Sequence, residues 1–386
     1  MRYTIGQLAE IIDGDRGKNY PKQDEFYPQG YCLFLNTGNV TKEGLTFEEN
    51  QFITKEKDEA LRKGKLKRGD IVYTTRGTVG NAGYYNSNVP YENVRINSGM
   101  VILRANGEIV DARFLYQILK SEYYRPYFKQ YCTGSAQPQL PIKNFSQIYL
   151  NVPDIKTQHR IADILSAYDD LIENNQKQIK LLEEAAQRLY KEWFVDLRFP
   201  GHENTEIVDG VPEGWIKEEI GKIIKKVHRT KQIVASEYKD EGSIPIVDQS
   251  RAFVAGYTND LEARVDFGIP IIVFGDHTRI VKLIQFPFAK GADGTQLIIS
   301  DCLEMPQRLL YCSIMNVDLS NYHYARHFKY LKEEKIMIPT VKVANEFENN
   351  VTGIFSKIQN CRDEIIRCQK TRDLLLPKLM SGEVEV

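Results

Sequence analysis

The most regular pattern along the chain is a stripe of apolar positions spaced four and three residues apart, and it occurs twice. The first stripe opens at Ile161 and continues without a slip to Trp193. The second opens at Phe347, 186 positions later (161 + 186 = 347), and keeps the same spacing. A seven-residue apolar repeat predicts a long helix whose narrow seam must be buried against a partner. We therefore predict two long helices that pair as a coiled coil, with these seam residues: Ile161, Leu165, Tyr168, Ile172, Asn175, Ile179, Leu182, Leu189, Phe347, Val351, Ile354, Ile358, Cys361, Ile365, Cys368 and Leu375.

Two polar residues interrupt these seams. Asn175 lies in the first, where a buried Asn usually fixes the register of a coiled coil at some cost in stability. Arg372 lies in the second, and it either marks a point where the helices splay or extends its charge into solvent. The segment between the helices is long enough for either a parallel or an antiparallel pair, so the spacing leaves the direction open.

The duplication extends to the start of each half. Residues 3–12 and 215–224 both begin with an aromatic residue and place Leu or Ile at matching positions. The shift between these segments is 212 positions (3 + 212 = 215), larger than the shift between the helices. The two halves thus share their edges and differ in their interiors. This pattern predicts one architecture used twice, for two different recognition tasks.

The interiors read as mixed strand and helix. We predict strands within residues 69–77, 96–103, 268–276 and 296–300, and helices within residues 113–129, 303–315 and 322–332. Pro200 and Gly201 punctuate the end of the first long helix. The domain boundaries that follow are 1–156 for a first globular domain, 157–198 for the first long helix, 199–342 for a second globular domain and 343–386 for the second long helix.

Composition limits the class of protein. A length of 386 residues suits two globular domains plus the helices, and 42% hydrophobic residues can form real cores. No apolar run reaches the roughly 18 residues of a membrane span, and no basic-then-apolar leader opens the chain, so we predict a cytoplasmic protein without membrane contact. Six cysteines without a Cys-x-x-Cys spacing indicate a reducing compartment and no structural metal. The net charge of −1 does not advertise a nucleic-acid binder but permits one whose charges are sorted to one face.

Motifs for catalysis are scarce. Residues 76–83 are glycine-rich but lack the Gly-Lys-Ser/Thr ending of a phosphate-binding loop, so a hairpin turn is favoured. His323 and His327 have the spacing of metal ligands on a helix, yet no Glu follows the first, and a surface or packing role is favoured. The chain shows no catalytic triad, dinucleotide fingerprint, acidic nuclease cluster or Asn-Pro-Pro-aromatic methyltransferase motif. We therefore predict no catalytic residue and no metal site.

Several basic and polar residues are candidates for DNA contact, although each taken alone also fits a solvated surface or a turn. Two basic clusters would contact phosphates without reading sequence: Lys65, Lys67 and Arg68, then Lys225, Lys226, Arg229 and Lys231. Polar side chains in turns would reach base edges: Thr75, Arg76, Thr78 and Asn81, then His277, Thr278 and Arg279. Gln137 and Gln139 join them, because Gln can form a two-pronged pair with adenine.

The chain resembles the specificity subunits of type I DNA restriction-modification enzymes along its whole length. The resemblance rests on residues 150–153 (LNVP), 158–165 (QHRIADIL), 169–175 (DDLIENN), 191–201 (KEWFVDLRFPG), 275–279 (GDHTR), 291–294 (GADG) and 379–383 (LMSGE). It implies an α+β fold in which two mixed α/β target recognition domains are separated by two long helices. These helices pair as an antiparallel coiled coil, and the whole forms a pseudo-two-fold internal repeat.

The resemblance also implies a function. The chain would be a non-catalytic subunit that binds a bipartite double-stranded DNA site and recruits two methyltransferase (modification) subunits and motor-nuclease (restriction) subunits. No cofactor would bind this chain, whereas S-adenosylmethionine, ATP and Mg would bind the partner subunits. The start of the second helix departs from the first, since Thr340, Val343 and Ala344 stand where Asp154, Thr157 and Gln158 would match.

Three alternatives remain open from the sequence. One is a coiled-coil adaptor that joins two proteins and never contacts DNA, which the near-neutral charge would suit. Another is the recognition subunit of a related system whose methyltransferase and nuclease are fused. The third is an enzyme with its own nuclease or methyltransferase site, which the missing motifs disfavour. Salt-dependent DNA binding would separate the adaptor from the DNA-binding readings, because phosphate contacts release counterions.

Overall fold

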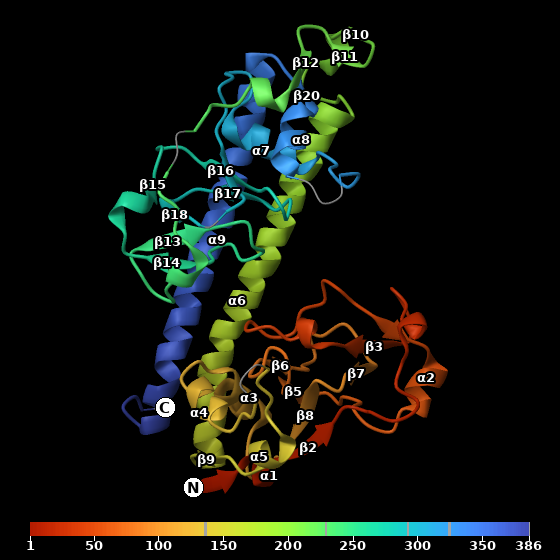
Figure 1. The fold of residues 1–386 in the computed structure, drawn as a ribbon, viewed down its shortest axis with the longest axis vertical. Coiled ribbons are helices and arrows are strands. Elements are labelled where there is room, and N and C mark those ends of the chain that lie inside the picture. Colours follow the sequence, from red (N-terminus) through yellow and green to blue (C-terminus); the bar gives the residue numbers. More distant parts are fainter. Residues whose placement is uncertain (135–136, 228–229, 292, 323–325, 386) are drawn as a thin grey trace. The chain divides into compact units, whose positions relative to one another are not determined.

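The computed structural model describes residues 1–134, 137–227, 230–291, 293–322 and 326–385. The chain forms two compact units, and each of them contains part of both long helices, α6 (Ile155–Tyr190) and α9 (Val341–Ser381) (Figure 1). Unit 1 comprises Met1–Asn174 and Glu364–Val386, and unit 2 comprises Asn175–Asp363. Each unit has its own hydrophobic core, so each is described by itself.

The long helices run antiparallel within each unit. In unit 2, Glu183 of α6 accepts a hydrogen bond from Arg362 of α9 at 2.8 Å. One to two turns further along α6, the Tyr190 ring packs 6.3 Å from the ring of Phe347, which lies earlier on α9. In unit 1, the early part of α6 likewise shares a core with the last turns of α9. The antiparallel coiled coil is therefore confirmed.

All predicted seam residues are buried or half-buried, and none is exposed. At three places the most buried residue is the neighbour of the predicted one: Tyr190 (5% exposed) beside Leu189, Phe355 (3%) beside Ile354, and Leu376 (2%) beside Leu375. A straight helix has 3.6 residues per turn, so a strict seven-residue repeat drifts around it and the buried position shifts by one residue. The buried positions therefore follow the period of a straight helix and not that of an ideal heptad repeat.

Helix α6 passes into a short π-helical turn, η3 (Lys191–Val195), before it ends. The Asp196 N–H donates to the Lys191 carbonyl at 2.8 Å, which closes the wider turn. Trp193 and Phe194 are buried there, and the Phe194 ring lies 5.5 Å from the ring of Trp215. These aromatic side chains anchor the end of α6 in the core of unit 2.

Unit 1 contains a four-stranded sheet in the order β2-β8-β5-β6, a three-stranded sheet in the order β4-β3-β7, and the pair β1-β9. All neighbouring strands are antiparallel except β3 and β7, which are parallel. The strands are β1 (Arg2–Thr4), β2 (Ala9–Asp13), β3 (Cys32–Leu35), β4 (Phe52–Ile53), β5 (Ile71–Thr74), β6 (Ala82–Tyr84), β7 (Val94–Ile96), β8 (Met100–Ala105) and β9 (Tyr149–Asn151). The short helices are α1 (Ile5–Leu8), α2 (Lys55–Ala60), α3 (Ala112–Lys120), α4 (Arg125–Lys129) and α5 (Ile142–Ser146).

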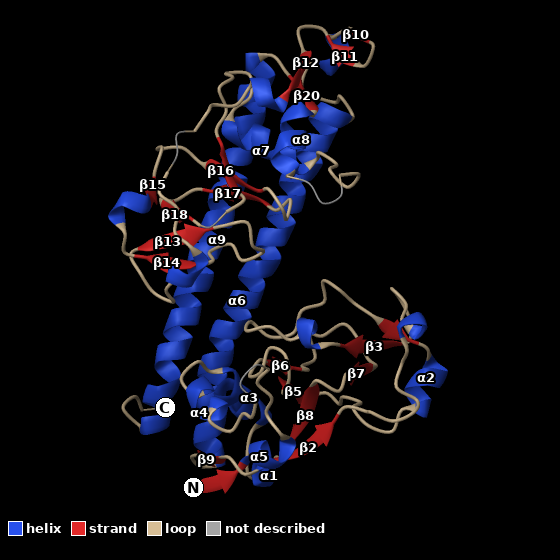
Figure 2. Cartoon of the chain, in the orientation of Figure 1, coloured by secondary structure: helices blue, strands red, loops and turns tan. Residues whose placement is uncertain are grey.

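Unit 2 contains sheets in the orders β17-β16-β19 and β14-β13-β18-β15, and the pairs β12-β20 and β10-β11 (Figure 2). Its parallel pair is β13 with β18. The strands are β10 (Ile207–Val208), β11 (Val211–Pro212), β12 (Ile216–Glu219), β13 (Ile244–Val247), β14 (Gly256–Thr258), β15 (Arg264–Val265), β16 (Ile271–Gly275), β17 (Val281–Ile284), β18 (Phe288–Lys290), β19 (Thr295–Ile298) and β20 (Lys335–Ile338). Its short helices are α7 (Gln307–Met315) and α8 (His327–Glu333).

The same topology occurs in both units, so the repeat extends into the interiors. In each unit, a central strand (β5 or β16) lies between two antiparallel neighbours, and a separate sheet contains one parallel pair (β3-β7 or β13-β18). A frame pair, β1-β9 or β12-β20, joins the start of each repeat to the segment just before a long helix. When the two halves of the sequence are aligned, they match only at this frame and along the long helices. The interior strands are short and their loops differ in length, so their equivalence is visible only in the structure.

Two predicted elements are each divided in two, and the predicted helix 303–315 begins only at Gln307. The predicted strand 96–103 is split, because the Asn97 side chain accepts a hydrogen bond from the Gly99 N–H at 2.9 Å and makes a turn between β7 and β8. The predicted helix 113–129 is two helices, α3 and α4. Ser121 ends α3 in an extended conformation, and Pro126 opens α4, where its missing N–H costs nothing.

None of the helices in the part of the chain that the structure describes combines the length and the apolar character needed to cross a membrane.

Candidate nucleic-acid interface

Four loops of unit 1 meet where β5 ends. We call residues 35–38, 75–81, 97–99, 133–134 and 137–140 the first corner. The Thr75 N–H donates to the Gly99 carbonyl at 2.9 Å, and the Leu140 N–H donates to the Thr75 carbonyl at 2.9 Å. The Asn97 N–H donates to the Leu35 carbonyl at 2.9 Å. Backbone bonds therefore tie all four loops to one another.

Unit 2 builds the same arrangement where β16 ends. We call residues 247–251, 275–280, 291, 293–294, 318–322 and 326–327 the second corner. The Asp276 N–H donates to the Gly294 carbonyl at 2.7 Å, and the His327 N–H donates to the Asp276 carbonyl at 2.9 Å. The Gly291 N–H donates to the Val247 carbonyl at 2.8 Å. These bonds match those of the first corner one for one.

A side-chain turn recurs at the same place in both corners. Asn36 accepts a hydrogen bond from the Gly38 N–H at 2.7 Å. Asp248 accepts one from the Ser250 N–H at 2.9 Å. Such turns fix the loop that follows a strand. The residues between, Thr37 and Gln249, therefore occupy equivalent places in the two corners.

The first corner brings together four of the predicted base-contacting residues with exposed side chains: Arg76, Thr78, Gln137 and Gln139. Their side chains make no hydrogen bond to another residue that the structure describes. Gln139 is held by backbone bonds to Thr133 on both sides, at 2.8 and 2.9 Å. This edge of unit 1 therefore presents polar side chains on a fixed backbone.

Two other predicted residues of this group lie beneath that surface. Thr75 is buried, and its hydroxyl donates to the Gly99 carbonyl at 3.1 Å. Asn81 is buried, and its amide donates to the Val40 carbonyl at 2.9 Å while its oxygen faces Arg125 at 3.4 Å. Both side chains hold the corner together, so they would support the readout and not contact bases directly.

The first basic cluster is largely engaged within unit 1. Arg68 donates to the carbonyls of Asn86 and Val89 at 2.6 and 2.8 Å, and its guanidinium lies 4.3 Å from the centre of the Tyr85 ring. Lys65 pairs at 2.5 Å with Asp58, which is almost fully buried. Lys67 is exposed and its ammonium has no ion pair among the described residues. Phosphate contact by these three side chains stays a prediction, and Lys67 is the freest of them.

The second basic cluster likewise contains lysines with acidic partners in unit 2 and one lysine without an ion pair to a described residue. Lys231 pairs with Asp260 at 2.7 Å and with Glu262 at 3.0 Å, and these bonds raise its pKa. Lys225 lies 3.7 Å from Asp301. Lys226 is exposed, and its ammonium forms no ion pair within the described part of the chain. Arg229 lies outside the described residues.

The predicted turn residues of unit 2 all lie in the second corner and are exposed. The His277 N–H donates to the Gln249 side-chain oxygen at 3.1 Å, and the Thr278 hydroxyl donates to the Gln249 carbonyl at 2.7 Å. Arg279 has a positive φ of 62° and donates to the Leu319 carbonyl at 3.1 Å. The His277 ring makes no hydrogen bond to a described residue, whereas the other two side chains brace the turn.

Two buried residues shape the second corner, and sequence reasoning singled out only the first of them. His327 is buried, and its ring nitrogens face the carbonyls of Asp276 and Tyr322, each at 2.9 Å. This agrees with the predicted packing role, while His323 lies outside the described residues. Lys282 is also buried, and it donates to the Asp248 carbonyl at 2.8 Å and to the Ala252 carbonyl. Burial lowers the pKa of Lys282 to about 8. No local sequence signal marks Lys282, because its hydrogen-bond partners lie in a distant loop.

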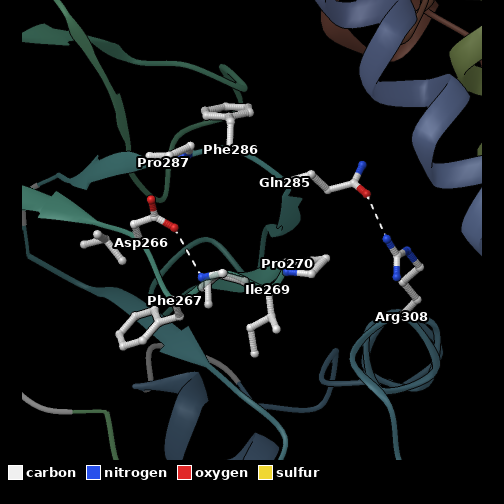
Figure 3. Close-up of a pocket in the computed structure, with 11 residues that line it drawn as sticks. Asp266, Phe267, Ile269, Pro270, Gln285, Phe286, Pro287 and Arg308 are labelled. Carbon is white, nitrogen blue, oxygen red and sulfur yellow. Dashed lines mark hydrogen bonds between the residues drawn. The ribbon is translucent and has the colours of Figure 1, made fainter.

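A hollow of about 360 Å³ lies at the opposite end of β16 from the second corner (Figure 3). Its lining combines apolar side chains, among them Phe267, Ile269 and Phe286, with the polar side chains of Asp266, Gln285 and Arg308. The Asp266 side chain accepts a hydrogen bond from the Gly268 N–H at 3.2 Å, and Arg308 pairs with Glu348 at 2.9 Å. The Asp266 carboxylate and the Arg308 guanidinium are therefore engaged within the protein, although the Arg308 Nε has no hydrogen-bond partner among the described residues.

A buried ionic network fastens the globular part of unit 1 to both long helices. Asp169 of α6 accepts hydrogen bonds from Lys120 at 2.7 Å, Gln117 at 2.6 Å and Arg372 at 2.8 Å. Burial raises the pKa of Asp169, but the charges of Lys120 and Arg372 and their hydrogen bonds outweigh it and hold the pKa below its usual value. Arg372, an intrusion in the predicted seam, is thus paired and not splayed.

Unit 2 is fastened to α9 by a different set. Arg308 of α7 pairs with Glu348 of α9, and Gln285 donates to the Phe355 carbonyl at 2.8 Å. The Arg362 guanidinium lies 3.7 Å from the centre of the Phe253 ring. Both corners are therefore carried by bodies that are firmly bonded to the long helices.

Within the described residues, no group of three or more His, Cys, Asp or Glu side chains is arranged to hold a metal ion.

Comparisons with known proteins point to one family. The family model described as the type I restriction modification DNA specificity domain matches residues 1–184. The type I restriction enzyme MjaIX specificity subunit of Methanocaldococcus jannaschii is 28% identical over 364 residues, which cover 85% of this chain and 81% of that protein. The HindI specificity subunit of Haemophilus influenzae is 32% identical over 195 residues, which cover 50% of this chain and 42% of that protein.

A solved structure supports the fold. The crystal structure of the type I restriction-modification S subunit from M. genitalium matches with a TM-score of 0.56 at 16% identity, over 98% of this chain and 95% of that one. At this identity the match shows the fold alone. The sequence relatives and this structure together show that the chain is similar, in sequence and in fold, to type I restriction-modification DNA specificity subunits.

Proposed function

We propose that the chain reads a split double-stranded DNA target, one half-site with each corner, and that its paired helices set the gap between the half-sites. The observation that carries this proposal is the duplicated corner. Equivalent backbone bonds hold equivalent loops in both units, while the exposed side chains differ. A shared frame with different polar side chains suits two readers of two different short sequences.

We also propose a division of labour between this chain and its partners. This chain would supply sequence recognition and carry no catalytic group. Two modification subunits would dock on it and methylate adenine with S-adenosylmethionine, and restriction subunits would use ATP and Mg to move and cut unmodified DNA. Support comes from the similarity of the chain to type I restriction-modification specificity subunits. The DNA substrate would place the assembly in the cytoplasm.

The direct test is selection of DNA by the purified chain in complex with its modification subunits, from a duplex library with a randomised stretch. We expect enrichment of two short motifs at a fixed separation. Binding should weaken as salt rises, because Lys67, Lys226 and other cations would displace counterions from phosphates. Uniform or absent enrichment would contradict the proposal and favour a protein adaptor.

The absence of catalysis is tested separately. The chain purified alone, given S-adenosylmethionine and a duplex that contains its target, should transfer no methyl group. Transfer at a rate comparable to that of the complete complex would overturn the division of labour while leaving the recognition proposal standing. A related system with a fused methyltransferase and nuclease would differ in the partner, so copurification of partner subunits distinguishes it.

A further inference from the structure

The two corners can be matched through the backbone bonds that they share. Thr75 and Asp276 each donate to the glycine before the next strand and each accept from the last loop. The residues that follow them, Arg76 and His277, therefore occupy equivalent places. Both side chains are exposed. Because Arg76 and His277 differ in their hydrogen-bond donors, side chains at these equivalent places would distinguish the two half-sites.

We propose that Arg76 and His277 are the matched base-reading residues of the two half-sites, and that Gln249 is a positioning residue for His277. This inference rests on the proposed DNA-reading function and assigns it to particular side chains. It also separates these residues from Thr75, Thr278 and Arg279, whose side chains are engaged in holding the loops.

Arg76 is held by its backbone, and its guanidinium makes no hydrogen bond to a described residue. Its N–H donates to the Gly99 carbonyl at 3.1 Å, so the start of the side chain is fixed. The next residue, Gly77, has a φ of +69°, which turns the chain sharply away and leaves the guanidinium on the surface. Arginine offers paired donors that match the edge of guanine in the major groove. A side chain with a fixed backbone, whose guanidinium binds no described residue, suits such a contact.

His277 is held by Gln249. The Gln249 amide oxygen accepts the His277 N–H at 3.1 Å, and the amide nitrogen donates to the Asp293 carbonyl at 2.9 Å. A Cβ atom added to Gly294 would lie 2.7 Å from the Gln249 amide nitrogen and 2.8 Å from His277 Cδ2. The amide and the imidazole therefore lie together over Gly294. Loss of the amide would release the loop that carries the ring.

The first corner has no such brace, and this gives the inference a built-in contrast. Thr37 stands where the second corner has Gln249, and a Cβ atom added to Gly99 would lie 2.8 Å from the Thr37 methyl carbon. The shorter side chain packs over its glycine without bridging two loops. Substitution at 249 should therefore change the readout by His277, whereas no equivalent coupling is expected between Thr37 and Arg76.

The test reads methylation motifs from cells that express the complete complex with one substituted chain at a time. Arg76→Ala should lower the preference at a base in one half-site by about 5- to 150-fold and leave the other half-site unchanged. His277→Ala should do the same in the opposite half-site. Gln249→Ala should relax the base that His277→Ala relaxes, and the double variant should relax it no further. Lys226→Ala is the control, because loss of a phosphate contact weakens methylation of all sequences alike.

The outcomes separate this inference from the proposed function. A wild-type complex that produces no split motif would sink the proposed function itself. A wild-type split motif that Arg76→Ala and His277→Ala leave intact, or change in both half-sites together, would overturn only the assignment of readers. Gln249→Ala that lowers methylation uniformly would reveal a merely structural role. Because Ala could loosen a turn, Arg76→Lys and His277→Asn are read in parallel, with thermal unfolding as a check on folding.

Discussion

Asp169 is the residue on which the attachment of unit 1 to the long helices depends most directly. It faces two cations, Lys120 and Arg372, whose side chains are 4% and 14% exposed. A buried ion pair adds little net stability over an apolar pair, but removal of one partner leaves an uncompensated charge. Here the loss of one carboxylate would leave two cations facing each other.

Asp169→Asn should therefore destabilise unit 1 by about 3 kcal/mol. The neighbouring Asp170 is exposed on the same helix, so Asp170→Asn is a matched control and should change stability by less than about 0.5 kcal/mol. Urea unfolding of both variants measures the difference. Equal effects of the two substitutions would show that the network contributes nothing.

The same carboxyl predicts a dependence on pH. Its pKa is lowered in the folded state, so the stabilisation is fully present above the unfolded value of about 3.9 and is lost as pH falls through the folded pKa. The amide that replaces this carboxyl in the Asp169→Asn variant cannot titrate. The difference in unfolding free energy between wild type and Asp169→Asn should stay constant above about pH 5 and shrink below about pH 4. A difference that grows on acidification would contradict the assignment.

At the scale of elements, the buried face of α9 can be tested against its exposed face. Ile358 is 1% exposed and Ile366, two turns later, is 45% exposed. Ile358→Ala should cost about 2–5 kcal/mol, because it removes buried methyl groups and leaves a cavity. Ile366→Ala should cost less than about 0.5 kcal/mol. Comparable losses at both positions, measured by urea unfolding, would mean that the helix is not paired as described.

The long helices and the fact that they pair could be predicted, because a seven-residue repeat is a signal that a single sequence carries in full. The resemblance to a family supplied the direction of pairing, which the spacing alone left open. The shift of the seam to Phe355 and Leu376 could not be predicted from the sequence. It arises because a straight helix has 3.6 residues per turn and a heptad repeat assumes 3.5.

The corners were predicted only in part. The turns that hold Arg76 and His277 were found, because glycine and polar residues after an apolar run indicate a strand end. Gln249, Lys282 and Asp169 escaped, because each acts on partners far away in sequence. The sequence also named Thr75 and Asn81 as candidates for base contact. Residue type alone could not show that both side chains are buried and hydrogen-bonded within the corner.

At the scale of the whole molecule, the proposed spacer role predicts a measurable shift in target geometry. One heptad that preserves the seam, inserted after Asn174 in α6 and after Asp363 in α9, adds roughly 10 Å to each helix. The preferred gap between half-sites should then grow by about three base pairs, at roughly 3.4 Å per pair. Two heptads should double the shift. A selected motif with an unchanged gap in both variants would refute the ruler.

The central claim is that this chain directs adenine methylation to a split DNA target. The most direct measurement is genome-wide adenine methylation in cells that express the modification subunit with and without this chain. We predict that the chain adds one new motif, made of two short half-sites around a fixed nonspecific gap. An unchanged methylation pattern, with the modification subunit present and active alongside another specificity subunit, would contradict the account and leave a protein adaptor in its place.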